Sequence, residues 1–482
     1  MLRVYELIEI NCLRKTRGMR TSRSERIIIF RFAQKRTLGS NPLTFPKEKS
    51  LTTILSGLFP ETSWRKREDS NLRYGCPHTR FPSVLLKPLG HTSVCSILYQ
   101  KTLKKQPESK TEFLWYNIEM KILGIETSCD ETAASVVENG VKILSNVVVS
   151  QIDIFAEYGG VIPEVAARSH LEAILPVIDK SLKDANLTWD DIDAIAVTHT
   201  PGLLGSLLIG TLTARTLAIL HNKPLFPVHH LKSHIYANWL SNPNEFDDSF
   251  SEHASEFPNN SNINFPLLAM VISGGHTQIL YMKEHNHFEI IGTTLDDAIG
   301  ECFDKVAKIL GLPYPGGPEI SKIAKNGGRK KYLLPHPNVK DLDFSFSGLK
   351  TAVLRAIQKE VGVGLDFPSF ELKNRLSEAQ KADFAASFEQ TATDIVLEKL
   401  KLALKQHPEA KSIVFAGGVS ANEYLRKNAK NLKIPTFFPE KSLSGDNGAM
   451  VASAAFFEIK SGVAPSDPYS LNISPRSDIS KS

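Results

Sequence analysis

The strongest constraint on the fold is a pattern that occurs twice: an apolar strand, a short polar turn and a second apolar strand. The first copy runs from 121–125 to 133–137, and the second from 267–272 to 278–281. The turn of the second copy contains paired glycines, which let a ligand approach the backbone. Each copy alone is compatible with an ordinary hairpin. Because one copy opens each half of the body, the pattern predicts an internal duplication with a cleft between two lobes.

Between and after these copies, helical and strand patterns alternate, which is typical of an α/β protein. Apolar residues recur at helical intervals over 163–186, a strand is expected at 192–197, and a glycine-bearing helix follows at 203–220. The hydrophobic content of 42% is ordinary for a globular core. No apolar run approaches the length of a membrane-spanning helix, so no membrane span is predicted.

These patterns divide the chain into segments. We expect a first lobe over residues 120–232, completed by 445–475, and a second lobe over 233–444. Residues 241–265 are rich in Asn, Ser and acidic side chains and are expected to form a flexible surface insertion. Residues 476–482 form a short tail. The five cysteines contain no CxxC pair, which argues against a thiolate zinc site and fits a reducing compartment.

Residues 1–119 differ from the body in charge. They hold 22 Lys and Arg against 10 Asp and Glu, whereas the remainder holds 35 against 42. Three explanations are open: a mitochondrial presequence, a basic nucleic-acid-binding arm, or translated DNA outside the natural gene. The third is favoured because residues 67–92 resemble the conceptual translation of a tRNA gene, and Met120 opens the regular pattern. We therefore expect a cytoplasmic protein, or a mitochondrial one if residues 1–119 are a presequence.

His230 and His234 are candidate metal ligands. If this stretch opens a helix, residues four apart lie on one face, so both imidazoles can bind one ion. The residues between them are Leu, Lys and Ser, so the motif lacks the Glu base of HExxH proteases. The alternative is a chance pair of histidines on a helix surface. Asp446 stands at the start of the last expected helix, where an N-cap is its default role.

Two further stretches are candidates for binding phosphate or RNA. In the turn 126–132, hydroxyls and backbone N–H groups supply donors, and Glu126 or Asp130 can orient water or a metal ion. Basic residues also concentrate at 322–331 in an otherwise acidic body, which makes this run a candidate RNA contact, or simply a solvated face. The members of this basic cluster are Lys322, Lys325, Arg329, Lys330 and Lys331.

Six motifs, in order, resemble the TsaD/Kae/Qri family. They are ETSCDET, HLKSH, SGGHT, the pair ECFDK and YPGGP, AGGVSAN and SGDNGAM. Members of this family are tRNA threonylcarbamoyladenosine synthases, once described as O-sialoglycoprotein endopeptidases. The resemblance covers residues 120–475, and the six ordered motifs are highly specific together. It implies the duplicated actin-like and Hsp70-like α/β fold (ASKHA), with two lobes and a cleft between them.

The resemblance also implies roles for individual residues. His230, His234 and Asp446 would bind one Fe²⁺ or Zn²⁺ per subunit. The adenylate would be held by Val271, Ile272, Ser273, Gly274, Gly275, Asp304, Gly317 and Asn422. Val271 stands where archaeal and eukaryotic members have a Tyr ligand, which indicates the bacterial or organellar branch. Ser321 replaces an acidic residue of some relatives, so one ribose contact is unassigned.

The implied reaction transfers a threonylcarbamoyl group from threonylcarbamoyl-AMP to N6 of adenosine 37. The acceptors are tRNAs that read ANN codons, and the product is N6-threonylcarbamoyladenosine (t6A). The implied partners are tRNA and proteins of the TsaB and TsaE types, without a membrane. One alternative is a metal-dependent glycoprotein endopeptidase, which the missing Glu disfavours. The other is a small-molecule kinase of the same fold, which needs no His–His–Asp site.

Overall fold

The computed structural model describes residues 119–241 and 262–479. The basic extension therefore lies outside the described residues, as does most of the expected insertion. The end of that insertion differs from the prediction, because Ile263 is only 8% exposed and belongs to the hydrophobic core. Phe265 packs against the same core.

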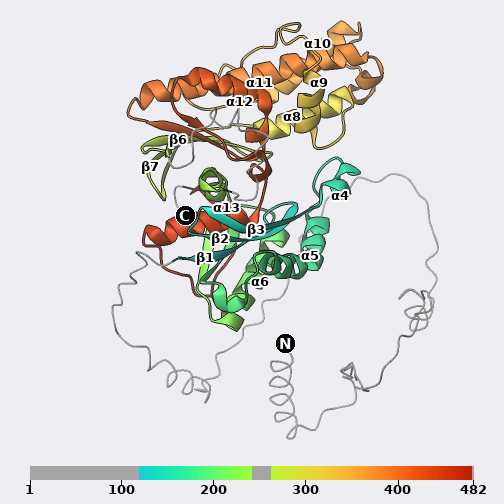
Figure 1. Cartoon of the computed structure of the whole chain (residues 1–482). Coiled ribbons are helices and arrows are strands. Elements are labelled where there is room, and N and C mark those ends of the chain that lie inside the picture. Colours follow the sequence, from blue (N-terminus) through green and yellow to red (C-terminus); the bar gives the residue numbers. More distant parts are fainter. Residues whose placement is uncertain (1–118, 242–261, 480–482) are drawn as a thin grey trace, which may run out of the picture. The chain divides into compact units, whose positions relative to one another are not determined.

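The first lobe is built on a five-stranded sheet in the order β3-β2-β1-β4-β5 (Figure 1). The first three strands pair antiparallel, and β1, β4 and β5 run parallel. The strands are β1 (Lys121–Glu126), β2 (Glu131–Glu138), β3 (Lys142–Ser150), β4 (Ala194–Thr200) and β5 (Leu225–His229).

The second lobe repeats this topology, with a sheet in the order β10-β9-β6-β7-β8. Its first three strands again pair antiparallel, while β9 pairs with β6 and β10 with β9, both in parallel. The strands are β6 (Leu267–Ile272), β7 (Thr277–Glu284), β8 (His287–Thr293), β9 (Ser412–Ala416) and β10 (Thr436–Phe437). The predicted duplication is confirmed, and the chain has the actin-like α/β fold.

Helices cover both faces of the first sheet. Alternate residues of β1 divide between two cores: Leu123 and Ile125 pack toward α5 (Pro163–Asp184) and α6 (Leu204–His221), whereas Ile122 packs toward α13 (Gly448–Lys460). The remaining helices are α4 (Ile152–Ala156), α7 (His230–Tyr236), α8 (Ile299–Leu310), α9 (Gly316–Ala324), α10 (Ser347–Glu360), α11 (Glu378–Gln406) and α12 (Glu423–Ala429). α7 is central, since it contacts α13 and strands of both sheets.

The helix α6 is the one described helix whose length and composition would allow it to cross a membrane, with a mean hydropathy of 1.3. In this structure it packs along α5 and β4. The guanidinium group of Arg215 donates hydrogen bonds to carbonyl oxygens of Pro468 and Tyr469. α6 is therefore a layer helix of the first lobe, tied to the C-terminal segment.

The C-terminal segment is fixed along the first lobe. Ser466 N donates to Leu225 O at 2.8 Å, and Ser474 N donates to His199 O at 3.1 Å. Gly202 N in turn donates to Pro475 O at 3.2 Å. Ile479, near the end of the described chain, is 2% exposed and packs in the same core as α7 and α13. The described part of this segment therefore reaches the core that α7 and α13 share.

The close contact between α13 and β1 predicts a stability effect. A Cβ atom at Gly124 would collide with the carbonyl oxygen of Gly448 and lie 2.7 Å from Ala452 N. Because backbone atoms cannot move aside cheaply, Gly124→Ala should destabilise the fold by at least about 1–3 kcal/mol. The measurement is the shift in thermal midpoint and in denaturant midpoint.

The matched control is Gly348→Ala in α10, where a Cβ meets nothing within 4 Å. That change should be neutral or slightly stabilising, because alanine favours a helix more than glycine does. Equal midpoints for Gly124→Ala and the unaltered chain would show that α13 does not pack on β1 as closely as described.

Candidate metal centre

The two histidines of the HLKSH motif lie on one face of a short buried helix. α7 begins at His230, directly after β5 ends at His229, and the side chain of His229 accepts a hydrogen bond from Leu231 N. His230 is 8% exposed and His234 1%. Their ring centroids are 4.6 Å apart and their planes nearly perpendicular, at 76°. They are a buried pair at the sheet edge, which excludes a chance pair on a solvated helix surface.

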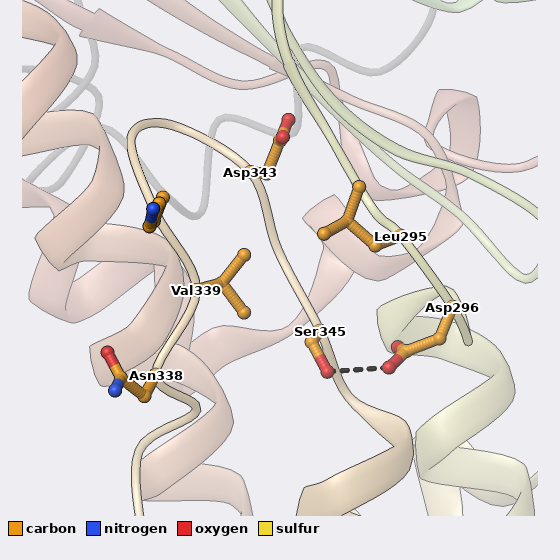
Figure 2. A pocket seen from close by; sticks show the side chains of 7 residues that line it. Leu295, Asp296, Asn338, Val339, Asp343 and Ser345 are labelled. Atoms are coloured by element: carbon orange, nitrogen blue, oxygen red, sulfur yellow. Dashed lines mark hydrogen bonds between the residues drawn. The ribbon is translucent and has the colours of Figure 1, made fainter.

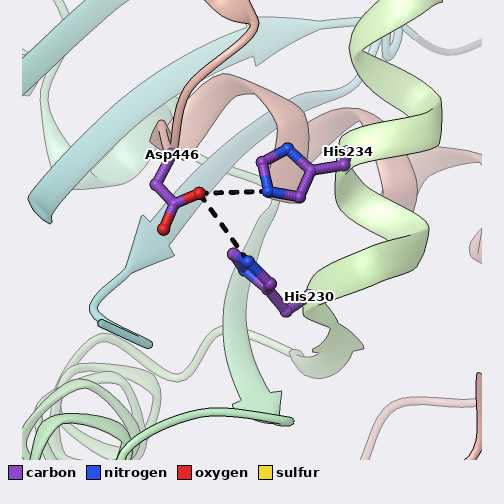
Figure 3. A group of neighbouring side chains, drawn as sticks. All are labelled: His230, His234 and Asp446. Atoms are coloured by element: carbon purple, nitrogen blue, oxygen red, sulfur yellow. Dashed lines mark ion pairs between the residues drawn. The ribbon is translucent and has the colours of Figure 1, made fainter. Parts of the chain in front are cut away.

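Asp446 completes the group (Figure 3). Its Oδ1 atom lies 3.0 Å from His234 Nε2 and 3.7 Å from His230 Nε2. The three side chains can each offer a ligand atom, and these atoms lie within 4.8 Å of one another. The alternative role for Asp446 is not seen, because the N-cap of α13 is Asn447, whose side chain accepts from Met450 N at 2.9 Å.

The ionised carboxylate of Asp446 favours a positive charge between the three side chains. Burial raises the pKa of Asp446, but His230 and His234 outweigh this effect and lower it to about 2. Burial likewise lowers the pKa of His230, but the carboxylates of Asp446 and Glu126 outweigh it and raise it to about 9. Either a proton or a bound cation can supply the positive charge. Two imidazole nitrogens and one carboxylate oxygen fit iron(II) or zinc, and leave coordination positions for a substrate.

Glu126 orients His230. The Glu126 side chain is 0% exposed, and its Oε2 atom lies 3.1 Å from His230 Nδ1 and accepts from Thr198 Oγ1 at 2.6 Å. Its Oε1 atom accepts from Ser128 N. Glu126 therefore contacts the candidate ligand His230 and the backbone of its own turn, and a phosphate-binding role of that turn stays a prediction. A carboxylate on one imidazole nitrogen fixes the tautomer and directs the other nitrogen to the metal.

Two further carboxyl groups, those of Asp130 and Glu131, interact electrostatically with the metal group. Burial, Asp446 and Asp130, in that order, raise the pKa of Glu131 to about 10. Asp130 also contributes, after burial, to a raised pKa of Tyr314 in the YPGGP turn. Asp130 is therefore close enough to act electrostatically on both Glu131 and the YPGGP turn. Glu131 was not among the predicted site residues. Its local sequence is that of an ordinary glutamate at the start of a strand, so it gave no signal of a role in the site.

The predicted adenylate residues form a ring of neighbouring loops at the ends of β6 and β9. At Gly274, Gly275 and Gly317 the side-chain position is open, because an added Cβ atom would meet nothing within 4 Å. Val271 and Ile272 are the last residues of β6 and are fully buried, so the exposed part of that motif begins at Ser273.

Contacts between the loops close this ring. Gly300 of α8 approaches the backbone of Ser273, and Gly417 approaches Ile272 O. Asp304 on α8 accepts from Gly316 N at 2.7 Å, which joins α8 to α9. Asn422, the N-cap of α12, donates from Nδ2 to Ser321 Oγ of α9 at 2.9 Å and to Glu389 Oε1 at 2.9 Å. The structure thus brings the predicted residues together, and adds Glu389 on α11 as a support that the sequence did not reveal.

The basic cluster is largely paired with carboxylates. The pairs are Lys322 with Glu319 at 3.8 Å, Lys325 with Glu423 at 3.1 Å, Arg329 with Glu389 at 2.7 Å, and Lys331 with Asp383 at 2.6 Å. The Arg329 guanidinium also stacks 3.6 Å from the ring centroid of Tyr424. Four acidic partners against five basic residues leave little excess positive charge. The sequence could not reveal this, because three of the partners lie more than 50 residues away.

The fold and the site together define a class: a duplicated α/β protein of actin-like topology, with a His–His–Asp group beside a glycine-lined ring of loops. Residues 142–453 match the TsaD family, described as tRNA N6-adenosine threonylcarbamoyltransferase. The chain belongs to this family.

Curated relatives with that same name agree. The relative from Clostridium novyi is 46% identical over 355 residues, which cover 72% of this chain and 95% of the relative. The relative from Thermomicrobium roseum is 44% identical over 353 residues, covering 71% of this chain and 93% of the relative. Among solved structures, HypF from T. kodakarensis has a TM-score of 0.47 and 14% identity. The matched region covers 71% of this chain and 48% of the HypF chain.

The contact between Glu126 and His230 predicts an effect on metal affinity. Glu126→Gln keeps the volume but removes the charge that holds His230 Nδ1–H, so zinc should bind about 10–100-fold more weakly. The measurement is competition with a zinc chelator. Glu138→Gln is the matched control, because Glu138 pairs with Lys121 and Lys142 at the far end of β2. Unchanged zinc affinity in a folded Glu126→Gln chain would contradict the orienting role.

Proposed function

We propose that this chain transfers a threonylcarbamoyl group from threonylcarbamoyl-AMP to N6 of adenosine 37 in tRNAs that read ANN codons. One Fe²⁺ or Zn²⁺ ion would be held by His230, His234 and Asp446. The observation that carries the proposal is the position of this group beside the glycine-lined ring of loops, in a chain of the TsaD family.

The reaction requires the protein to hold its two substrates in the correct relative orientation. It does not require a nucleophile from the protein. The N6 amine attacks the carbamoyl carbon, a C–N bond forms, the C–O bond to AMP breaks, and N6 loses one proton. A bound metal ion would supply Lewis acidity to a carbonyl or phosphate oxygen of the donor. Gly274, Gly275 and Gly317 would admit the adenylate, and Asp304 would accept from its ribose hydroxyls. Holding the leaving group in place lowers the entropic cost of the transfer.

The geometry of α7 does not favour an endopeptidase. The residues between the two histidines are buried, with Leu231 at 2%, Lys232 at 1% and Ser233 at 0% exposed. Lys232 Nζ lies 3.6 Å from Glu458 Oε1 on α13, so it serves the packing of α7 on α13. The helix offers no carboxylate that could act as the base of an HExxH site.

Partner proteins of the TsaB and TsaE types would complete the enzyme. The proposed contact for the TsaB-type protein is an apolar face on α5 and α6, where leucines recur every four residues and remain exposed. This α5–α6 face consists of Leu171 at 65%, Leu175 at 49%, Leu204 at 60%, Leu208 at 43% and Leu212 at 44% exposed. α5 and α6 pack side by side, so a second pair of apolar helices can cover both at once.

The basic cluster at 322–331 remains a proposed tRNA contact. A phosphate there would compete with the carboxylates of Glu319, Glu423, Glu389 and Asp383. Each such contact should therefore contribute less than the slope of about 0.7–0.9 expected for a free cation when log affinity is plotted against log salt. We expect other parts of the chain, or a partner protein, to provide most of the RNA contact.

The central test removes a metal ligand. The double variant His230→Ala/His234→Ala should lose bound metal, and tRNA from cells that depend on it should lose t6A. The measurements are metal content by elemental analysis and nucleoside mass spectrometry after depletion and complementation. His287→Ala is the control, because His287 is exposed at the start of β8. Stoichiometric metal in the double variant would refute the site, and normal t6A without metal would refute its role.

The partner face is tested separately. Leu208→Glu places a charge among the leucines of the α5–α6 face and should weaken binding of a purified TsaB-type protein at least about tenfold, since a buried unpaired charge is costly. The measurement is a titration by calorimetry. Leu333→Glu is the control, because Leu333 is 92% exposed in the second lobe. An unchanged affinity of Leu208→Glu for the TsaB-type protein would contradict the proposed contact. A change only in self-association would assign the face to a second copy of this chain.

A further inference from the structure

Arg329 differs from the paired lysines of the basic cluster, because its side chain is held on two sides. Its Nη1 atom donates to Glu389 Oε2 of α11 at 2.7 Å, and its guanidinium carbon lies 3.6 Å from the ring centroid of Tyr424 in α12. The Arg329 side chain is 27% exposed, whereas those of the three lysines that pair with carboxylates are between 53% and 74% exposed. A guanidinium group that is stacked on one face and paired at its edge is already engaged by the protein.

The segment that carries Arg329 is fixed along α11. Gly328 N donates to Asp383 Oδ1 at 2.7 Å. Ser387 Oγ accepts from Tyr332 N at 3.2 Å and donates to Gly328 O at 3.2 Å, so one hydroxyl holds the backbone on both sides of Arg329. The place of the guanidinium group is therefore set by the packing of this segment, which is what a positioning role requires.

Glu389 extends this contact to Asn422. The Glu389 side chain is 2% exposed, and its second oxygen, Oε1, accepts from Asn422 Nδ2 at 2.9 Å. A buried carboxylate is unfavourable unless a cation and hydrogen-bond donors compensate it. Arg329 supplies the cation, and Asn422 supplies a donor. Removal of Arg329 would leave this carboxylate buried without a cation, next to the amide that it holds.

The amide group of Asn422 is oriented by three contacts. Its Nδ2 atom donates one hydrogen to Glu389 and the other to Ser321 Oγ of α9 at 2.9 Å. Its Oδ1 atom accepts from Leu425 N at 2.8 Å, which caps α12. Both amide hydrogens are thus used within the protein. Asn422 is one of the residues expected to hold the adenylate, so a chain of contacts runs from Arg329 to the donor site.

Another carboxylate of the second lobe shows that a cation is not a general requirement there. Asp296 lies beside a cavity of about 370 Å³ (Figure 2). It is exposed, and its donors are Ser345 Oγ, Ser347 Oγ and the backbone N–H of Phe346. Neutral donors hold this exposed carboxylate, whereas the buried carboxylate of Glu389 has a cation beside it.

We propose that Arg329 is a positioning residue of the donor site, which acts through Glu389 to fix the amide of Asn422 against the bound adenylate. The inference rests on the proposed function, in which threonylcarbamoyl-AMP is the donor. It assigns Arg329 to donor binding and leaves the other four basic residues as the candidates for tRNA. Because Arg329 touches no substrate, its removal should lower the affinity for the donor and leave the chemical step nearly unchanged.

The test compares Arg329→Gln with the unaltered full chain, each together with its partner proteins, and uses AMP as the probe in calorimetry. Arg329→Gln should weaken AMP binding about tenfold, as expected when a hydrogen bond to a charged group is lost. It should raise the KM for threonylcarbamoyl-AMP by a similar factor, with little change in kcat. Arg329→Lys keeps the charge beside Glu389 and should retain most of the affinity, although the planar stacking on Tyr424 is lost.

A second substitution separates positioning from loss of the fold. Glu389→Gln removes the buried charge but keeps an oxygen that can accept from Asn422 Nδ2. Combined with Arg329→Gln, it should restore most of the AMP affinity that Arg329→Gln alone loses, because no unpaired charge remains. Arg355→Gln is the matched control, since Arg355 is exposed on α10 and donates within that helix to Gln358 Oε1. It should change neither the affinity for AMP nor the KM for the donor.

The outcomes are distinct. Unchanged AMP affinity in Arg329→Gln overturns the inference, and so does a double variant that binds AMP no better than Arg329→Gln. The double variant has no buried unpaired charge, so it remains testable even where Arg329→Gln does not fold. AMP affinity in it that is about tenfold or more below that of the unaltered chain also overturns the inference.

Salt dependence identifies the competing role. A decrease of about 0.7–0.9 in the slope of log tRNA affinity against log salt, with unchanged AMP affinity in Arg329→Gln, would assign Arg329 to a phosphate contact and overturn the inference. If the unaltered chain binds AMP but forms no t6A with its partners, the proposed function fails, and the variants still decide the role of Arg329 in the AMP site.

Discussion

The structure of the site depends on one contact, between Glu126 at the end of β1 and His230 at the start of α7. It joins the central strand of the first lobe to the helix that also touches the second sheet. The same carboxylate is held by Thr198 of β4 and by Ser128 in the adjoining turn. The position of His230, and through it the geometry offered to a metal ion, is therefore set by the sheet rather than by a loop.

Around this contact, the chain keeps negative charge in the site and neutralises most of its basic cluster. Asp446 stays ionised beside the two histidines, so the interior of the site attracts a cation. The basic residues at 322–331 are mostly neutralised by acidic partners.

The sequence predicted the elements that depend on local pattern. The strand periodicity of 121–125 and 267–272 predicted the duplication. It could not predict contacts between residues far apart. Glu126 and His230 are 104 residues apart, and Arg329 and Glu389 are 60 apart, so neither pair leaves a local signal. The role of the C-terminal segment was missed for the same reason.

The most direct measurement is the X-ray absorption spectrum of the metal-loaded chain at the iron or zinc edge. The His230–His234–Asp446 group predicts a first shell of nitrogen and oxygen only, with the outer-shell scattering of two imidazole rings. A sulfur scatterer at about 2.3 Å, the distance of a zinc–thiolate bond, or fewer than two imidazole rings, would contradict the assignment of the metal centre.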